Sequence, residues 1–139
     1  MKVLCIANRG SAVPAQYFDP RMPGGPQSEF SVTPSRMYLV YALRFLSNQV
    51  WYYIDDDTRV WYPTRMPAPL FKIVDPRMSK LWGIRVSEGK RGSNVLLAFE
   101  EWLSVAEFYD RLTDREDQEV RTYQQRKREM DEEFPERVE

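Results

Sequence analysis

Three consecutive carboxylates, Asp55, Asp56 and Asp57, are the residues of this chain whose types and spacing come closest to a chemical site. With Glu101 they are nominal candidates for a carboxylate-dependent enzyme, and neighbouring carboxylates can also bind a divalent cation. Consecutive residues rarely direct their oxygens to one point, however, and no EF-hand spacing follows. Aspartates favour turns because their side chains accept hydrogen bonds from nearby backbone amides. The sequence therefore predicts a turn here and no metal site.

Other catalytic groups are scarce in the 139 residues. The chain contains no histidine, and so it has no imidazole base, no Ser-His or Cys-His pair and none of the commonest zinc ligands. Cys5 is the only cysteine, and its apolar surroundings favour a packing role. Gly24-Gly25 lacks the lysine that follows in a phosphate-binding loop. We therefore expect a non-enzymatic protein without a cofactor, with a carboxylate-dependent enzyme as the third alternative.

Short strands are predicted along the first part of the chain, where aliphatic, β-branched and aromatic runs alternate with turn residues. The predicted strands are 2–7, 37–43, 50–54, 59–62 and 70–74. Residues 11–29 contain four prolines and two glycines, which predicts a long irregular loop. Three prolines in 63–69 predict a segment that crosses the end of the sheet. Five short strands with one long early loop favour a small SH3-like β-barrel over an OB-like one.

The second part of the chain predicts a hairpin and then helices. Residues 81–86 and 94–99 flank a turn-rich segment and predict an added β-hairpin. Two capping-box sequences, at 104–107 and 113–116, predict the starts of two helices. A stripe at helical spacing predicts that the second helix packs on its own domain or, as the less favoured alternative, against a partner, and that it ends at Pro135. The stripe consists of Val120, Tyr123, Lys127, Met130 and Phe134.

These elements predict one α+β domain, because a chain of this length encloses one hydrophobic core. Within residues 1–139 the predicted parts are a barrel (1–75), an added hairpin (76–99), a helical extension (100–134) and a tail (135–139). The N-terminal apolar run is too short for a signal-peptide core or a membrane span. We therefore expect a cytoplasmic protein with no membrane partner.

The strand residues also carry a family resemblance. Residues 2–8, 30–33, 38–41, 51–57, 62–63 and 69–74 resemble small bacterial SH3-like proteins. The remainder, with 79–82 and 99–102, is similar to C-terminal extensions of bacterial proteins that include candidate immunity proteins of polymorphic toxin systems. The resemblance implies a non-enzymatic inhibitor that neutralises a cognate toxin by binding it. Since fold likeness does not fix a partner, it transfers no individual binding residue.

Charge is unevenly distributed along the chain. Residues 1–99 contain 13 basic and 7 acidic residues, whereas residues 100–139 contain 7 basic and 14 acidic ones. A solvated helix face, or docking of one part on the other, would explain this asymmetry as well as a recognition surface would. An acidic surface would speed encounter with a toxin that has a basic surface, and exposed aromatic side chains would anchor the complex.

The predicted partner contacts are Tyr17, Phe18, Trp51, Tyr53, Trp61, Tyr62, Glu107, Asp110, Asp114, Glu116, Asp117 and Glu119. Alternation along a strand means that only about half of the strand aromatics point into the core.

A nucleic-acid-binding module is the second alternative, because small barrels often stack bases on exposed aromatic rings. The basic residues are scattered, however, with runs only at 90–91 and 126–128. Nucleic acid is therefore the less favoured partner.

Overall fold

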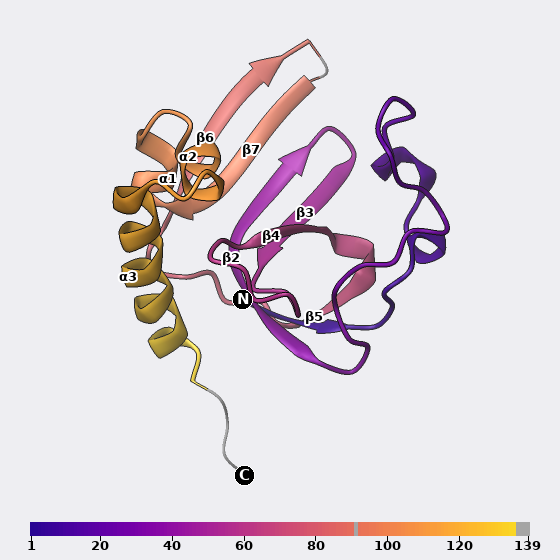
Figure 1. Cartoon of the computed structure of the whole chain (residues 1–139), viewed down its shortest axis with the longest axis horizontal. Coiled ribbons are helices and arrows are strands. Elements are labelled where there is room, and N and C mark those ends of the chain that lie inside the picture. Colours follow the sequence, from indigo (N-terminus) through magenta and orange to yellow (C-terminus); the bar gives the residue numbers. More distant parts are fainter. Residues whose placement is uncertain (91, 136–139) are drawn as a thin grey trace.

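The computed structural model describes residues 1–90 and 92–135, and within them the chain has an α+β fold (Figure 1). The strands are β1 (Lys2–Cys5), β2 (Met37–Leu46), β3 (Gln49–Ile54), β4 (Thr64–Pro67), β5 (Phe71–Asp75), β6 (Trp82–Gly89) and β7 (Gly92–Phe99). The α-helices are α1 (Glu100–Ser104), α2 (Phe108–Thr113) and α3 (Asp117–Glu133). The predicted α+β class is confirmed. Of the predicted tail, 135–139, all but Pro135 lies outside the described residues.

Strand β2 organises the antiparallel sheet because it pairs along both of its edges. On one edge it pairs with β3, across a tight turn at Ser47 and Asn48. On the other edge its first residues pair with β1 and its last four with β7. The strand order is β4-β3-β2-β1-β5, and β6 lies outside β7. The predicted added hairpin is therefore confirmed as β6 and β7, and it extends the same sheet.

The strand predicted at 59–62 is wrong. Residues 59–62 lie in a loop, where Arg59 has a positive φ of 52°. The strand that pairs with β3 is β4, which lies in the segment expected to cross the end of the sheet. Pro67 of β4 lies opposite Trp51 and has no backbone N–H to donate. It is tolerated because β4 is an edge strand, and no further strand needs that donor. The 3-10 turn η3 (Ala68–Leu70) then leads directly into β5.

The two faces of the sheet carry two hydrophobic cores. Neighbouring side chains of β3 point to opposite faces, since Tyr52 lies in the first core and Tyr53 in the second. The first core includes Cys5, which is 1% exposed, as its predicted packing role requires. The second core lies under the helices, and Trp102 of α1 and Met130 of α3 are buried in it. Alternation along each strand explains why one sheet can bury both faces.

The long loop after β1 folds back on the sheet. It contains two short 3-10 turns, η1 (Gly10–Ala12) and η2 (Ala15–Tyr17). Its two arms approach closely, since a Cβ atom at Gly10 would lie 2.0 Å from the carbonyl oxygen of Gly25. In Figure 1 this loop (indigo) and α3 lie on opposite sides of the strands.

Both capping-box predictions are wrong. Ser104 is the last residue of α1 and Thr113 the last of α2, and each hydroxyl donates to a carbonyl of its own helix. Such local bonds compete with capping. Helices α2 and α3 instead begin after Glu107 and Glu116, neither of which caps through its side chain.

The stripe predicted on the last helix is confirmed. Tyr123 and Met130 are buried in the second core, and Phe134, the C-cap of α3, is also buried.

In the part of the chain that the structure describes, no helix is long and apolar enough to cross a membrane.

Candidate functional site

The three aspartates of the acidic turn point to different partners. Asp56 accepts a hydrogen bond from the backbone amide of Thr58 (3.1 Å), and Asp57 accepts one from the hydroxyl of Tyr38 (2.6 Å). Asp55 instead faces a lysine of α3. Across residues 1–90 and 92–135, no group of three or more potential ligands lies close enough to hold a metal ion. The turn prediction is confirmed, and the three carboxylates do not form one site.

The structure separates the four predicted aromatic anchors. Tyr53 is 3% exposed, and its ring contacts those of Trp102 and Tyr109 at centroid distances of 4.9 and 5.2 Å. Trp61 and Tyr62 pack against the second core. Tyr53 therefore offers no surface to a partner. Strand alternation does not apply to Trp61 and Tyr62, and the outward-facing aromatic predicted for their strand is wrong, because these two residues are not in a strand.

Trp51 differs from the other three because it belongs to neither core. The ring of Tyr17 lies 5.3 Å from its ring, and the Arg65 guanidinium stacks 4.4 Å from the ring centroid. The indole N–H of Trp51 donates to the Gln49 side chain (2.9 Å). Tyr17 is fixed in turn, since its hydroxyl accepts a bond from the Val50 amide (2.9 Å). The structure thus brings two of the predicted contacts together in a rigid arrangement.

Phe18, the other loop aromatic, is directed elsewhere. It is half-buried and packs against the first core. Its ring also lies close to the point where the two arms of the loop meet, next to Gly10. Phe18 therefore contributes mainly to holding the loop on the sheet.

The predicted acidic contacts fall into two groups. Glu119 is 6% exposed and lies 3.7 Å from Arg111, so it is not an available surface charge. The other five are exposed, and none forms an ion pair with another described residue. They are Glu107, Asp110, Asp114, Glu116 and Asp117. Arg111 and Arg115 lie between them in the sequence and Arg121 follows them, and this surface is therefore of mixed charge rather than uniformly acidic.

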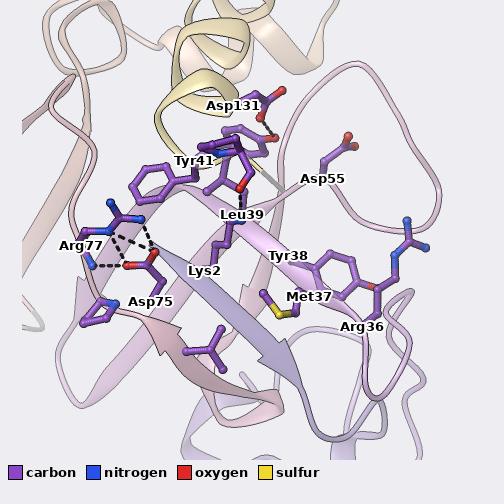
Figure 2. Close-up of a pocket in the computed structure, with 14 residues that line it drawn as sticks. Lys2, Arg36, Met37, Tyr38, Leu39, Tyr41, Asp55, Asp75, Arg77 and Asp131 are labelled. Atoms are coloured by element: carbon purple, nitrogen blue, oxygen red, sulfur yellow. Dashed lines mark hydrogen bonds and ion pairs between the residues drawn. The ribbon is translucent and has the colours of Figure 1, made fainter. Parts of the chain in front are cut away.

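A recess of about 1250 Å³, the α3 groove, lies between the start of β2, the end of β5 and the end of α3 (Figure 2). The Tyr41 hydroxyl donates to Asp131 (2.7 Å), and Lys127 donates to both of them (3.0 and 3.1 Å). Burial, followed by the bond to Asp131, raises the pKa of Tyr41, which keeps the phenol protonated as a donor. Asp75 is paired with Arg77 in the same groove. The bonds that Asp131 and Lys127 of α3 form with Tyr41 hold α3 against β2.

A second recess of about 590 Å³, the arginine recess, lies between the sheet and the start of α2. It is lined by Arg44 of β2, Arg65 of β4 and Arg85 of β6, together with Glu107 and Asp110. The recess lies on the same side of the sheet as the second core, because Tyr53 and Trp102 also line it.

Strand register explains why these arginines meet. Arg44 lies opposite Trp51 on one side and Leu96 on the other, and Leu96 lies opposite Arg85. Directly paired residues of antiparallel strands share a face, which puts this row on one side of the sheet. Arg65 of β4 is not paired with any of these four residues, Trp51, Arg44, Leu96 and Arg85. It reaches them because its guanidinium stacks on the Trp51 ring.

The three arginines have few partners. Arg44 donates through Nη1 to Asn94 at 3.4 Å, while its Nε is shielded from solvent and has no partner among the described residues. Arg85 donates to the Leu103 carbonyl (2.8 Å). In residues 1–90 and 92–135, none of the three forms an ion pair. The sequence prediction missed this cluster because each arginine stands alone in its own segment, and only the pairing register could have revealed it.

Comparison with known proteins adds no relative: no family model matches the chain, and neither a curated protein nor a solved structure does. The site therefore has to be interpreted from its own geometry.

Proposed function

We propose that this protein is a non-enzymatic, protein-binding inhibitor, of the kind represented by bacterial immunity proteins that neutralise a cognate toxin by direct binding. The observation that carries the proposal is Trp51, which lies outside both cores and is held between Tyr17 and Arg65. Trp, Tyr and Arg are the residue types that dominate binding energy at protein interfaces. Because these rings are already fixed, little side-chain entropy would be lost on binding.

An SH3-like barrel is the scaffold in this proposal. Side chains from all five of the first strands, β1 to β5, contribute to the first core, as the filled interior of a small barrel requires. One long loop follows β1, and a single 3-10 turn joins β4 to β5. The proposed location is the cytoplasm, which agrees with the one free and buried cysteine.

Charge would guide the proposed encounter. The five exposed carboxylates from Glu107 to Asp117, which form no ion pair with other described residues, lie in and beside α2, and two of them reach the arginine recess. A basic surface on the partner would be attracted to them, which raises the association rate more than the final affinity.

Co-expression with the product of the adjacent upstream gene tests the proposal. We expect the neighbour alone to stop growth, and this chain to restore growth and bind the neighbour directly. Trp51→Ala should weaken binding by about tenfold or more, as loss of an interface anchor does. Met22→Ala is the control, because Met22 is 64% exposed in the long loop and contacts neither core. A harmless neighbour, or Trp51→Ala binding as tightly as the wild type, would contradict the proposal.

A nucleic-acid-binding module is the second candidate, and the arginine recess beside Trp51 is the observation that favours it. Arginines that contact phosphates, next to an aromatic ring that stacks on bases, are typical of single-strand binding surfaces. Titration with single-stranded oligonucleotides at low and moderate salt tests this candidate through intrinsic fluorescence. No saturable change at low salt would remove it.

A further inference from the structure

The arginine recess collects positive charge without the partners that usually accompany it. Arg44, Arg65 and Arg85 reach it from three different strands, and they form no ion pair with any residue that the structure describes. Two carboxylates, Glu107 and Asp110, line the same recess and are equally unpaired there. The described lining therefore has an excess of one positive charge.

Arg44 is the residue that most needs a ligand. A guanidinium has five N–H donors, and burial of a donor without an acceptor is unfavourable. The Arg44 Nε atom is shielded from solvent and has no partner, and the only side-chain bond that Arg44 makes to the described chain is the long one to Asn94. At least one buried donor of this side chain is thus left without an acceptor.

The neighbours of Arg44 hold the recess in a fixed shape. Arg65 is positioned by stacking on the Trp51 ring, and Arg85 by its bond to the Leu103 carbonyl. The ring of Tyr53, locked between Trp102 and Tyr109, forms part of the wall. A site whose side chains are already oriented loses little entropy when a ligand binds.

We propose that the arginine recess is an oxyanion-binding site that takes one carboxylate or one phosphate group. The planar fork of donors on a guanidinium matches both groups, which accept two parallel hydrogen bonds. An oxyanion would supply acceptors for Arg44 and relieve the repulsion between the three cations. Glu107 and Asp110 would disfavour a long polyanion, and so the recess selects a single group. The inference goes beyond the proposed function, since a free anion would bind even if the protein had no protein partner.

The test is a titration of the full chain with inorganic phosphate and, separately, with glutarate, at constant ionic strength. The readouts are the NMR signal of the Arg44 Nε–H group and the melting temperature. We expect saturable movement of that signal and a melting temperature that rises with anion concentration, because a ligand that binds the native state stabilises it. Saturation by phosphate alone or by glutarate alone supports the site and identifies its preferred group. No saturable response to either anion would overturn the inference.

Matched variants separate the recess from general charge effects. Arg44→Met and Arg85→Met should each weaken anion binding by about tenfold or more, and Arg44→Lys, which keeps the charge but loses the fork, by less. Arg9→Met is the control, because Arg9 is exposed and does not line the recess. Since Arg85 is exposed, its variant keeps the test valid if Arg44→Met does not fold.

Two further results would overturn the inference. One is an equal loss of anion binding in Arg9→Met and in the two recess variants. The other is binding of a single-stranded oligonucleotide through these arginines without any response to phosphate or glutarate, which would identify a nucleic-acid surface instead.

Discussion

The α3 groove and the arginine recess contain similar residue types but differ in how their charges are satisfied. In the groove, Lys127 contacts Tyr41, Asp55 and Asp131, and Arg77 is paired with Asp75. In the recess, three arginines and two carboxylates line one space, and none of these five side chains forms an ion pair with a described residue. A charged cluster is thus not by itself a sign of function. The groove uses its charges to hold a helix, and the recess leaves them available to a ligand.

The difference follows from the elements on each side. The groove is closed by α3, a helix of 17 residues whose apolar stripe is buried and whose polar residues meet those of β2. The recess lies beside α2, a helix of 6 residues that begins directly after Glu107, whose backbone is left-handed (φ 56°). A short helix presents few side chains to the sheet, and those of α2 that are buried are the apolar Phe108 and Leu112. The one carboxylate that α2 brings to the recess, Asp110, forms no ion pair with the arginines in the described chain.

The largest expected effect comes from removing the apolar anchor of α3. Met130→Ala should lower the free energy of unfolding by about 2–5 kcal/mol, because Met130 is 1% exposed and its loss leaves a cavity in the second core. Urea denaturation measures the change. Met22→Ala, at a position that is 64% exposed, should change stability by less than about 0.5 kcal/mol. Equal losses in the two variants would show that α3 is not held by this core.

The next largest effect is expected when one basic residue is removed from the α3 groove and, separately, one from the arginine recess. Lys127→Met should cost about 1–2 kcal/mol, because Tyr41 and Asp131 lose a shared partner in a partly buried network. Arg44→Met should leave stability unchanged or raise it, because it removes a guanidinium whose shielded Nε has no acceptor within the described chain. Thermal unfolding in buffer without phosphate or carboxylate measures both. A larger loss in Arg44→Met than in Lys127→Met would show that the recess, and not the groove, depends on its charges for stability.

A smaller effect should appear at acid pH in the ion pairs that tie α3 to α1. Hydrogen bonds from Arg126 lower the pKa of Glu101 below its usual value of 4.5. The folded state therefore binds the proton less readily than the unfolded state does. This stabilisation is fully present above pH 4.5 and is lost as pH falls through the lower pKa of the folded state.

Melting temperatures between about pH 7 and about pH 3 measure the change. Glu101→Gln should flatten the acid side of the profile. In an Arg126→Gln background the same substitution should have little further effect, because the interaction is already absent. An unaltered acid slope in Glu101→Gln would show that this pair makes no contribution.

The smallest effect on stability is expected at the exposed carboxylates. Glu116→Lys with Asp117→Lys should change the free energy of unfolding by no more than about 0.5 kcal/mol, since both side chains are exposed. Association with a basic partner should nevertheless slow by up to about tenfold at low salt. Rate measurements at two salt concentrations separate this effect from loss of fold. An unchanged association rate would locate the interface away from α3.

Most elements with a strong local pattern were predicted correctly. Strands β2 and β3, the hairpin of β6 and β7 and the buried stripe of α3 follow from alternation and helical spacing. The capping boxes failed because Ser104 and Thr113 bond within the helices that they end, and the strand predicted at 59–62 failed because two segments compete for the same edge of the sheet. Trp61 and Tyr62 have strand-forming side chains, but they pack against the second core while the neighbouring Thr64–Pro67 pairs with β3. Local propensity cannot decide such a competition, because the outcome depends on burial against residues far along the chain.

By composition and pattern alone, the chain determines an α+β fold class, the absence of histidine chemistry and an acidic final part. Which charges are satisfied depends on strand register and on where the helices pack. Glu119 is buried beside Arg111, whereas Arg44, Arg65 and Arg85 meet in one recess and form no ion pair with any described residue. The reason is physical: a charge is neutralised by its neighbours in space, and pairing between distant strands sets those neighbours.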